Sequence, residues 1–570
     1  MEKYKDIKQL LKKIYGDEKG GLAFTKINVL MEKFPASQKM KNGYFSQKDV
    51  ILITYGDTLN KNGEMPLITM HEFANKFLKD TFSHIHFLPF CPFSSDDGFS
   101  VMDFFSVNRK LGSWTDIELT GTDFKLMFDL VLNHISAKSK WFEYYLLEKE
   151  GYKELAIEID PSIDLSAVTR PRSFPLLTEV KKQSGKTVHV WTTFSADQID
   201  LNFKSIDVLE KMVETLLFYM QKGASIIRLD AIAYLWKEIG TSCIHLGQTH
   251  DVVKLFRLIF DKVAPHVMIL TETNVPHDEN ISYFGDGNNE AQMVYNFTLP
   301  PLLLYSFLKE DASVLSNWAR GLDLKSDSNT FFNFTASHDG IGVRPLEGIL
   351  PAKEINLLVE TVKNNGGKVS YKKNSDGSES PYELSPYELN ITYVDALLNT
   401  KFDPDRYHAQ RFLASQAIQY AFPGVPATYI HSLLGSRNWE DGVRQTNMAR
   451  TINREKLRTD DVISQLEDFE TFRSRIFHPY INMIKVRKEQ PAFHPNAGFE
   501  ILSIDPKIFI IARYGKDQTL YALTNISSSE VSCTLKGGGL PPMMKDLLTG
   551  ERLSIDSLQL NPYQFVWLTV

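Results

Sequence analysis

Residues 226–231 read Ile-Ile-Arg-Leu-Asp-Ala, and this stretch decides the fold that the rest of the 570-residue chain predicts. In a β-strand, side chains alternate between faces, so Arg228 and Asp230 point one way while Ile227 and Leu229 point the other. A guanidinium beside a carboxylate favours the ionised acid. An ionised carboxylate fixed at a strand end suits a nucleophilic step on a glycoside. Because Arg-x-Asp on a strand is more often a buried structural ion pair, the stretch alone leaves both interpretations open.

Seven further short apolar runs accompany this one, and longer segments with a helical pattern separate them. Continuous apolar strands that alternate with helices predict a parallel sheet buried on both faces. Eight such strands predict an α/β fold of the (β/α)8 TIM barrel type. A doubly wound sheet is the competing architecture, but no glycine-rich phosphate loop follows the first strand. The predicted strands are residues 50–55, 84–90, 126–132, 225–231, 267–271, 293–297, 331–336 and 427–430.

Segments outside the strand pattern predict the domain organisation. Ile7, Leu10, Leu11 and Ile14 follow the helical repeat near the start of the chain. Two gaps are longer than ordinary barrel loops, and long insertions at such loops usually build the substrate site. Alternating apolar and polar residues after position 497 predict a small β domain. We therefore expect an N-terminal helical extension (1–48), a barrel in three parts (49–134, 206–339 and 401–496), two inserted subdomains (135–205 and 340–400) and a C-terminal β domain (497–570).

The composition excludes several classes of protein. A charged fraction of 23% and an apolar fraction of 43% are ordinary for a globular enzyme. The net charge of -7 argues against nucleic acid or an anionic membrane as a partner. Three cysteines without metal-ligand spacing fit reduced thiols in a cytoplasm. The charged first residues lack the apolar core of a secretory signal, and no run of 18 apolar residues is present.

Polar motifs follow four of the predicted strands, at the ends where barrel enzymes carry their chemistry. Each motif alone could be a loop hydrogen-bonding group or a helix cap. His338 beside Asp339 could suggest a hydrolase triad, but contiguous residues do not converge in that way. Their joint occurrence, in order and at strand ends, is what a purely structural interpretation leaves unexplained. The motifs are Asp129-Leu-Val-Leu-Asn-His134, Arg228-Leu-Asp230, Thr271-Glu-Thr-Asn274 and Thr335-Ala-Ser-His-Asp339.

Together these motifs resemble the four catalytic motifs of the α-amylase superfamily of glycoside hydrolases and transglycosidases. The resemblance implies that Asp230 is the nucleophile, Glu272 the general acid/base and Asp339 a third carboxylate that grips sugar hydroxyls in the transition state. The chemistry agrees, because the acid must stay protonated until needed while its partner stays ionised. The resemblance also implies that Arg228, His134 and His338 make the matching contacts to the sugar and the nucleophile.

Five further stretches resemble the sucrose phosphorylase group, and most of all its glucosylglycerate phosphorylase branch. They lie at residues 93–99, 170–172, 194–202, 237–243 and 449–454. By this resemblance Asp96 and Arg450 bind the outer hydroxyls of glucose, Phe99 forms a sugar platform, Phe194 and Gln198 line the site, and Tyr234 lies near the nucleophile.

The acceptor side of the site is less sharply predicted. Arg172 resembles the phosphate-binding position, and a guanidinium can hold phosphate oxygens bidentately. Tyr387 and Glu388 match acceptor-loop positions, but residues 380–389 are a tandem duplication, Ser-Pro-Tyr-Glu-Leu, so Tyr382-Glu383 could occupy that register instead. Arg344 is a candidate for binding a carboxylate of the aglycone, with a solvated loop charge as the alternative.

These observations favour a retaining α-glucoside phosphorylase that converts glucosylglycerate and phosphate to α-D-glucose 1-phosphate and D-glycerate by double displacement. The alternatives are a phosphorylase of sucrose, sucrose 6′-phosphate or glucosylglycerol, an α-glucosidase or transglucosidase, and a non-catalytic scaffold. A scaffold has no reason to keep Asp230, Glu272 and Asp339 around one pocket. Asn133 resembles a calcium ligand of many amylases, but no acidic cluster completes that site. We expect no metal and no cofactor, a cytoplasmic monomer or homodimer, and no partners beyond a small glucoside and inorganic phosphate.

Overall fold

The computed structural model describes residues 4–34, 43–171, 174–373, 384–398, 406–535 and 540–570. Its centre is a closed barrel of eight parallel strands, in the order β1-β16-β12-β11-β10-β9-β4-β3. Each predicted strand overlaps one of these, so the predicted TIM barrel is confirmed. The strands are β1 (Ile51–Thr54), β3 (His84–Phe87), β4 (Lys125–Val131), β9 (Ala224–Asp230), β10 (Met268–Thr271), β11 (Met293–Tyr295), β12 (Thr330–Asn333) and β16 (Val425–Tyr429).

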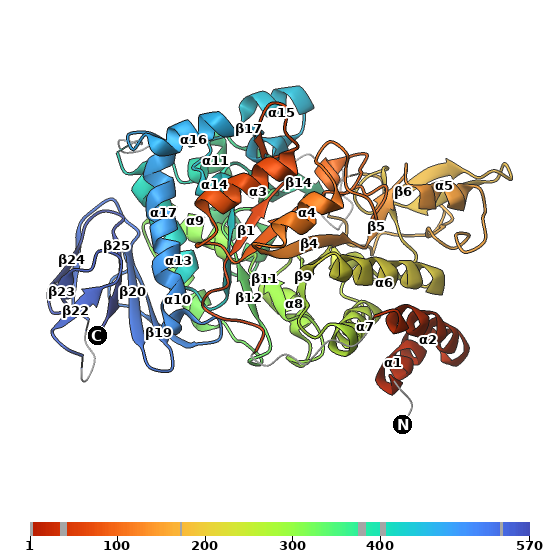
Figure 1. Ribbon diagram of the computed structural model, residues 1–570, viewed down its shortest axis with the longest axis horizontal. Helices are drawn as coiled ribbons and strands as arrows, with labels where there is room; N and C mark the ends of the chain where they lie inside the picture. Colours follow the sequence, from red (N-terminus) through yellow and green to blue (C-terminus); the bar gives the residue numbers. More distant parts are fainter. Residues whose placement is uncertain (1–3, 35–42, 172–173, 374–383, 399–405, 536–539) are drawn as a thin grey trace.

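Helices surround the barrel and bury the outer faces of its strands (Figure 1). The four residues of β1 are buried on both faces, as a continuous apolar run requires. Pro66 begins α3, where its missing N–H leaves no hydrogen bond unmade. The covering helices are α3 (Pro66–Phe77), α4 (Trp114–Thr120), α6 (Ile206–Gln221), α7 (Gly247–Val263), α9 (Leu299–Lys309), α10 (Ser313–Arg320), α13 (His408–Ala421) and α17 (Phe472–Lys488).

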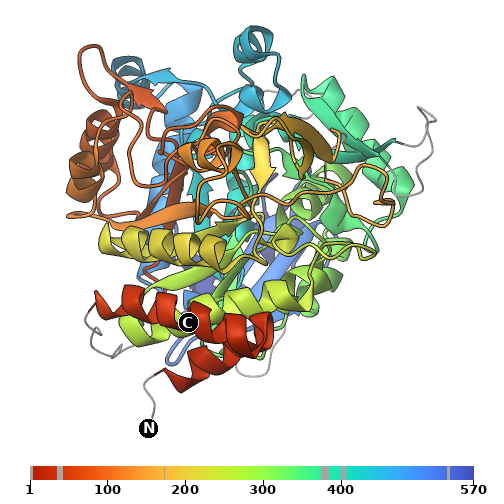
Figure 2. The ribbon, with the colours of Figure 1, turned by 90° about the vertical axis from the view of Figure 1, so that its right-hand side faces the viewer.

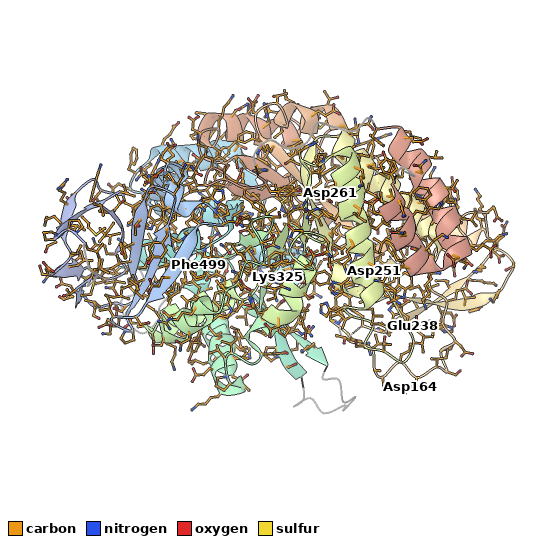
Figure 3. The ribbon with its side chains drawn as sticks, turned by 90° about the horizontal axis from the view of Figure 1, so that it is seen from below. Asp164, Glu238, Asp251, Asp261, Lys325 and Phe499 are labelled. Carbon is orange, nitrogen blue, oxygen red and sulfur yellow. The ribbon has the colours of Figure 1, made fainter. Side chains whose placement is uncertain are left out.

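The N-terminal extension is a pair of helices, α1 (Lys5–Tyr15) and α2 (Asp17–Glu32), that lie side by side below the barrel in Figure 2. Gly20 lets them approach, because a Cβ there would lie 2.6 Å from the carbonyl oxygen of Leu11. The pair is attached to the helices that follow β8 and β9. Lys13 Nζ lies 2.7 Å from Oδ1 of Asp251 on α7, which Figure 3 labels beside the N-terminal helices.

The first insertion adds two small antiparallel pairs beside the barrel. Its elements are β5 (His134–Ser136), α5 (Lys140–Leu146), β6 (Leu177–Lys181), β7 (Thr187–Trp191) and β8 (Gln198–Asp200), and β5 pairs with β8 while β6 pairs with β7. The β5–β8 pair matters for the site, because it brings His134 and Gln198 to the mouth of the barrel.

The second insertion forms a three-stranded antiparallel sheet in the order β13-β15-β14. Its elements are β13 (Ile341–Gly342), α11 (Ala352–Asn364), β14 (Lys368–Lys373) and β15 (Leu384–Asn390). The second copy of the duplicated pentapeptide, residues 385–389, lies in β15. Tyr382 and Glu383 of the first copy lie outside the described residues.

The C-terminal residues form a six-stranded antiparallel sheet with a smaller pair beside it. Alternate residues of β19 face two different cores: Phe509 and Ile511 join the core of the barrel, whereas Ile508 and Ile510 join a second core on the far side. The sheet is therefore packed directly onto α10 and α13. The start of a separate C-terminal domain at residue 497 stays a prediction. Its strands are β18 (Gly498–Leu502), β19 (Ile508–Tyr514), β20 (Thr519–Asn525), β21 (Val531–Cys533), β22 (Met543–Asp546), β23 (Arg552–Ser554), β24 (Leu558–Leu560) and β25 (Phe565–Thr569).

Short elements complete the described chain. They are β2 (Leu59–Asn60), α8 (His277–Ile281), α12 (Tyr393–Ala396), α14 (Ile430–Leu433), α15 (Glu440–Thr446), β17 (Leu457–Arg458) and α16 (Thr459–Glu467). Within the described part of the chain, no helix is both long enough and apolar enough to cross a bilayer.

Candidate active site

An open cavity lies at the carboxyl ends of the barrel strands. Most of the residues that the sequence predicts for the site line it, and they come from separate strand ends and from both insertions. These residues are Asp96, Phe99, His134, Phe194, Gln198, Asp230, Tyr234, Glu272, His338, Asp339, Tyr387, Glu388 and Arg450.

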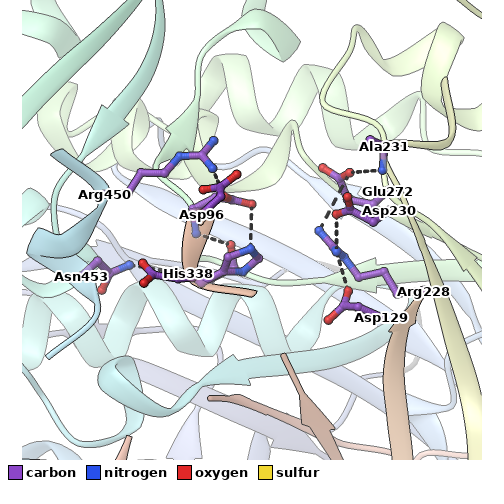
Figure 4. A network of polar contacts seen from close by, with 12 residues as sticks. Asp96, Asp129, Arg228, Asp230, Ala231, Glu272, His338, Arg450 and Asn453 are labelled. Carbon is purple, nitrogen blue, oxygen red and sulfur yellow. Dashed lines mark hydrogen bonds and ion pairs between the residues drawn. The ribbon is translucent and has the colours of Figure 1, made fainter. Parts of the chain in front are cut away.

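Strand β9 delivers Arg228 and Asp230 on one face, as its alternation predicts. Nη1 of Arg228 donates to Oδ1 of Asp230 at 2.7 Å and also to Asp129, which stands opposite Arg228 on β4. Nη2 of Arg228 lies 3.9 Å from Oε2 of Glu272 at the end of β10. Arg228 is buried between Asp129 on one side and Asp230 and Glu272 on the other, and it does not itself line the cavity (Figure 4). One guanidinium thus serves three carboxylates.

Asp230 and Glu272 share a single cation, and the surroundings of both carboxyl groups favour the protonated form. Burial raises the pKa of both carboxyl groups, the neighbouring carboxylates raise it further, and Arg228 opposes the rise. Such a pair titrates as a unit. The contact of Arg228 is much closer to Asp230 than to Glu272, so Arg228 stabilises the ionised form of Asp230 more than that of Glu272. The backbone N–H of Ala231 donates to Oε2 of Glu272 at 3.1 Å and fixes its position.

A turn and a histidine support this arrangement. Ala231 has a φ of 52°, an unfavourable conformation for a residue with a side chain, and the turn directs its N–H toward Glu272. Behind Arg228, Nε2 of His86 lies 2.8 Å from Oδ2 of Asp129. Burial raises the pKa of Asp129, but Arg228 and His86 outweigh it and bring this pKa to about 2. Asp129 is therefore a fixed negative charge that holds Arg228 in place.

Asp339 has a different setting at the end of β12. Oδ1 of Asp339 lies 2.7 Å from Nη1 of Arg450, and Nη2 of Arg454 lies 3.9 Å away. Burial alone would raise the pKa of Asp339, but Arg450, His338 and Arg454 hold it well below its usual range. Figure 4 shows Arg450 and His338 at the left of the view and the cluster around Arg228 at the right. Asp339 is therefore ionised throughout the neutral range.

Neutral polar and aromatic side chains complete the walls. Burial lowers the pKa of His338 to about 3 and lowers that of His134, so both imidazoles are uncharged at neutral pH. The ring of Phe99 stacks on His338, with centroids 4.7 Å apart. Nε2 of Gln198 lies 3.1 Å from Nε2 of His134 and 3.3 Å from Oδ2 of Asp96. Uncharged imidazoles and an amide beside a carboxylate are groups that hydrogen-bond sugar hydroxyls.

The acceptor-side predictions have mixed outcomes. Tyr387 and Glu388 of the second repeat line the cavity, and both carboxylate oxygens of Glu388 accept hydrogen bonds from Arg450. Arg344 does not line the cavity: its Nη2 lies 3.7 Å from Oε2 of Glu279. Only 15% of its side chain is exposed, so the alternative of a solvated loop charge is wrong. Arg172 lies outside the described residues.

Sequence reasoning missed several lining residues, chiefly Asn274, Val275 and Phe297. Asn274 stands in the motif that ends β10, but the motif gave no indication of where its side chain points. Phe297 follows β11, and its apolar side chain places it in the predicted strand at 293–297. No sequence signal separates an aromatic residue that faces a cavity from one that fills a core.

No group of three or more His, Cys, Asp or Glu side chains in the described ranges could hold a metal ion. At Asn133 the position for a cation is filled by a side chain. The ammonium of Lys237 lies 2.7 Å from Oδ1 of Asn133 and 2.5 Å from Oδ2 of Asp200, and all three side chains are buried. The negative charge of Asp200 is thus balanced within the protein.

Comparisons with known proteins agree with this geometry. Residues 78–338 match the α-amylase catalytic-domain family. The chain is 44% identical to a glucosylglycerate phosphorylase from Spirochaeta thermophila, over 100% of this chain and 99% of that protein. It is also 44% identical to a glucosylglycerate phosphorylase from Escherichia coli, over 99% of each. The crystal structure of a sucrose 6F-phosphate phosphorylase from Thermoanaerobacter thermosaccharolyticum shares the fold, with a TM-score of 0.75 and 24% identity over 91% of this chain and 99% of that one.

Proposed function

The chain belongs to the α-amylase family, in the group that contains the glucosylglycerate phosphorylases, and we therefore propose that it catalyses the reversible phosphorolysis of glucosylglycerate to α-D-glucose 1-phosphate and D-glycerate. The full-length identity to glucosylglycerate phosphorylases carries the proposal, because it covers the barrel, both insertions and the C-terminal sheet together. The enzyme is on this basis a glycosyltransferase that acts as a glucoside phosphorylase.

We assign the chemistry to two carboxylates. Asp230 attacks the anomeric carbon of the glucosyl unit while Glu272 donates its proton to the departing oxygen of glycerate. An oxygen of inorganic phosphate then attacks the same carbon, Glu272 takes the proton from that phosphate, and Asp230 leaves. Two inversions give net retention. The contact of Arg228 with both carboxyl groups supports this assignment, because it keeps them within a few ångströms of each other, as retaining enzymes require.

We assign the recognition of glucose to the other side of the cavity. Asp339, Arg450 and Asp96 present charged groups to the hydroxyls, and His134 and His338 present neutral imidazoles. Phe99, whose ring stacks on His338, lines the cavity and is proposed as the apolar contact for the sugar ring. A permanently ionised Asp339 suits a hydrogen-bond acceptor that strengthens its contacts as positive charge develops on the sugar.

The acceptor side is proposed from the sequence and from Tyr387, which lines the cavity on β15. Glu388 orients Arg450 through its two hydrogen bonds. Arg172 remains the proposed phosphate ligand on sequence grounds. Arg344 remains a proposed contact for the carboxylate of glycerate, which it could reach only by leaving Glu279. All three cysteines are buried and free, which supports a reducing compartment, so we propose the cytoplasm.

The test is a phosphate-release assay with α-D-glucose 1-phosphate and each of four acceptors: D-glycerate, glycerol, fructose and fructose 6-phosphate. We expect D-glycerate to give the highest kcat/KM. A higher value for another acceptor would reassign the aglycone and keep the phosphorylase. Release of glucose from glucosylglycerate at a rate that does not depend on phosphate would instead identify an α-glucosidase.

A further inference from the structure

A carboxylate outside the cavity accepts hydrogen bonds from three serine hydroxyls. This carboxylate belongs to Asp197, which precedes Gln198 and does not line the cavity. Its Oδ2 atom accepts from Oγ of Ser94 at 2.5 Å, from Oγ of Ser95 and from Oγ of Ser100 at 2.9 Å. A hydrogen bond from a hydroxyl to a carboxylate is stronger than one between neutral groups. Because the three serines belong to one short loop, Asp197 holds that loop at three points.

The loop that Asp197 holds carries Asp96 into the cavity. Asp96 and Asp97 have φ angles of 52° and 46°, which are uncommon for residues with a side chain. Gly98 follows with a φ of 114°, and a Cβ there would lie 2.7 Å from the carbonyl oxygen of Pro89. A backbone with this conformation persists only where surrounding contacts hold it. The position of the Asp96 carboxylate therefore depends on the contacts of the loop.

The backbone of Asp197 is itself anchored. Its carbonyl oxygen accepts hydrogen bonds from the N–H of Ala137 and from Oγ of Ser100, both at 2.9 Å. Ala137 follows β5 and Asp197 precedes β8, so these two residues meet at one end of the β5–β8 pair. The first insertion thus presents an anchored carboxylate to the loop of Asp96.

A second ionic contact holds the same loop. The guanidinium of Arg454 donates to the carboxylate of Asp97. Arg454 also donates to the carbonyl oxygen of His338 and lies 3.9 Å from Asp339, so its loss would disturb several parts of the cavity. Within the described part of the chain, the side-chain hydrogen bonds of Asp197 go to the loop alone. Removing the Asp197 carboxylate therefore tests the loop by itself.

We propose that Asp197 is a positioning residue for the glucosyl site: through the serine hydroxyls it fixes the backbone of residues 94–100, and so holds the carboxylate of Asp96 where the sugar hydroxyls bind. This inference rests on the proposed function, which assigns Asp96 to the recognition of glucose. Oδ2 of Asp96 lies 3.3 Å from Nε2 of Gln198, the residue that follows Asp197. Asp197 therefore supports both partners of this contact.

A carboxylate that is already in place binds a sugar better than one that must first be ordered. Ordering a loop on binding uses part of the free energy that its contacts with the ligand provide. Without Asp197, the uncommon backbone conformation of Asp96 and Asp97 would relax, because fewer contacts would hold it. The loss of Asp197 should thus weaken the contribution of Asp96 without touching the sugar.

The test is a double-mutant cycle on the full-length enzyme, with α-D-glucosyl fluoride as the donor. The kcat/KM for fluoride release reports the formation of the glucosyl-enzyme and does not depend on the acceptor. We expect Asp197→Ala to lower this kcat/KM on the order of tenfold. In the Asp96→Ala enzyme the same substitution should lower it less than about twofold, because the residue through which it acts is gone. Asp197→Asn, which keeps the shape and one acceptor oxygen, should lose less than Asp197→Ala.

Asp160→Ala is the matched control. Asp160 is an exposed residue of the same insertion that does not line the cavity, and its Oδ1 accepts from the N–H and from Oγ of Ser162 at 2.9 and 2.7 Å. Its loss should leave kcat/KM unchanged with and without Asp96. If circular dichroism shows that Asp197→Ala does not fold, the double variant Ser94→Ala/Ser95→Ala replaces it in the cycle. That variant removes two of the three hydroxyls and should show the same pattern.

A merely structural role for Asp197 predicts a different cycle. Asp197→Ala would then lower kcat/KM by the same factor in the presence and in the absence of the Asp96 carboxylate. That result, or no loss in either background, would overturn the inference.

Failure of the proposed function has its own signature, because fluoride release does not involve glycerate. A wild-type enzyme that releases fluoride but transfers no glucose to D-glycerate would reassign the aglycone, and the cycle would still decide the role of Asp197. A wild-type enzyme that releases no fluoride would overturn both.

Discussion

The two carboxylate clusters of the cavity differ in how many guanidinium groups lie beside the acid. Asp339 has Arg450 and Arg454 for neighbours, and its pKa is held well below the usual range. Asp230 and Glu272 share Arg228 with Asp129, and burial and mutual repulsion raise the pKa of both. Carboxyl groups thus provide a permanent negative charge at one end of the cavity and a pair that can hold a proton at the other end.

The difference shows how one fold separates binding from proton transfer. A carboxylate that never protonates can strengthen its contacts as the sugar becomes positive. A pair that holds a proton can give it to a leaving group and take it back. If this comparison is right, substitutions at the two ends of the cavity must change different properties of the enzyme, and not only change one property by different amounts.

The largest effect is expected for Asp230→Asn, which removes the nucleophile without changing the shape of the side chain. Activity should fall by at least about 10^4-fold, as for other single nucleophile substitutions. Mass spectrometry of the acid-quenched protein with α-D-glucosyl fluoride should show no glucosyl adduct. Asp339→Asn is the comparison: it should still form an adduct on Asp230, only more slowly. An adduct mapped to any other residue would contradict the assignment.

The next effect is expected for Glu272→Gln, and it depends on the leaving group. Loss of proton donation should reduce transfer from glucosylglycerate by about 10^2- to 10^4-fold. Release of fluoride, which needs little protonation, should fall far less. The measurement is the rate of transfer from glucosylglycerate and from α-D-glucosyl fluoride in Glu272→Gln and in Asp339→Asn. Asp339→Asn should slow both donors by the same factor, whereas Glu272→Gln should slow glucosylglycerate far more. Equal losses in Glu272→Gln would remove it from the acid role.

A smaller effect is expected for Arg172→Ala. Phosphate approaches an end of the cavity that already holds three carboxylates around one guanidinium, so an additional cation must offset the repulsion. One charge-assisted hydrogen bond contributes roughly 1.5–3 kcal/mol, so phosphorolysis should fall by about 10- to 100-fold. Transfer to water should fall far less, and the ratio of hydrolysis to phosphorolysis should rise.

Arg170→Ala is the matched control for Arg172→Ala. Arg170 stands two positions before Arg172 in the sequence, and its guanidinium donates to the carbonyl oxygen of Phe174. Its loss should not change the ratio of glucose to α-D-glucose 1-phosphate formed from one donor. If Arg172→Ala behaves in the same way, the phosphate contact lies elsewhere, with Arg344 or Tyr387 as the next candidates.

The barrel was predictable because each strand is buried on both faces and so reads as an apolar run. Strand ends were less predictable. The predicted strands at 293–297 and 331–336 continue past Tyr295 and Asn333, where β11 and β12 end. Phe297 and Phe334 are buried beyond those ends, where their rings pack on Tyr295 and on each other. The sequence reveals which residues are buried, but it does not reveal which of them pair with a neighbouring strand.

The site was predictable where a residue stands on a strand end and not where a residue depends on a partner far along the chain. Asp230 and Glu272 follow directly from their strands. The close approach of Gly342 to the side chain of Asn274 joins residues from different strand ends, and the contact of Glu388 with Arg450 joins two separate loops. The burial of Arg344 against Glu279 was missed for the same reason. Such contacts leave no local pattern.

The smallest predicted effect is on stability, and its sign should be opposite at the two ends. Asp339→Asn removes a carboxylate that two guanidinium groups hold ionised, and should lower the free energy of unfolding by about 1–3 kcal/mol. Glu272→Gln removes a carboxyl whose ionisation burial and the neighbouring carboxylates disfavour, and should raise the free energy of unfolding by about 0.5–2 kcal/mol.

The dependence of these changes on pH distinguishes them further. The pKa of Asp339 is lower in the folded than in the unfolded protein, so its contribution is present above its ordinary value of 3.8 and disappears only as the pH falls through the folded value. The loss in Asp339→Asn should therefore be the same at pH 5 and pH 8.

The pKa of Glu272 is higher in the folded protein, so wild-type stability falls as the pH rises from its ordinary value of 4.5 through the folded value. The gain in Glu272→Gln should therefore be larger at pH 8 than at pH 5. Urea midpoints of the three proteins at both pH values measure this, with a common slope as the check on two-state behaviour. A gain that shrinks with pH would mean that the pKa of Glu272 is lower in the folded than in the unfolded protein, and the contrast between the two clusters would be lost.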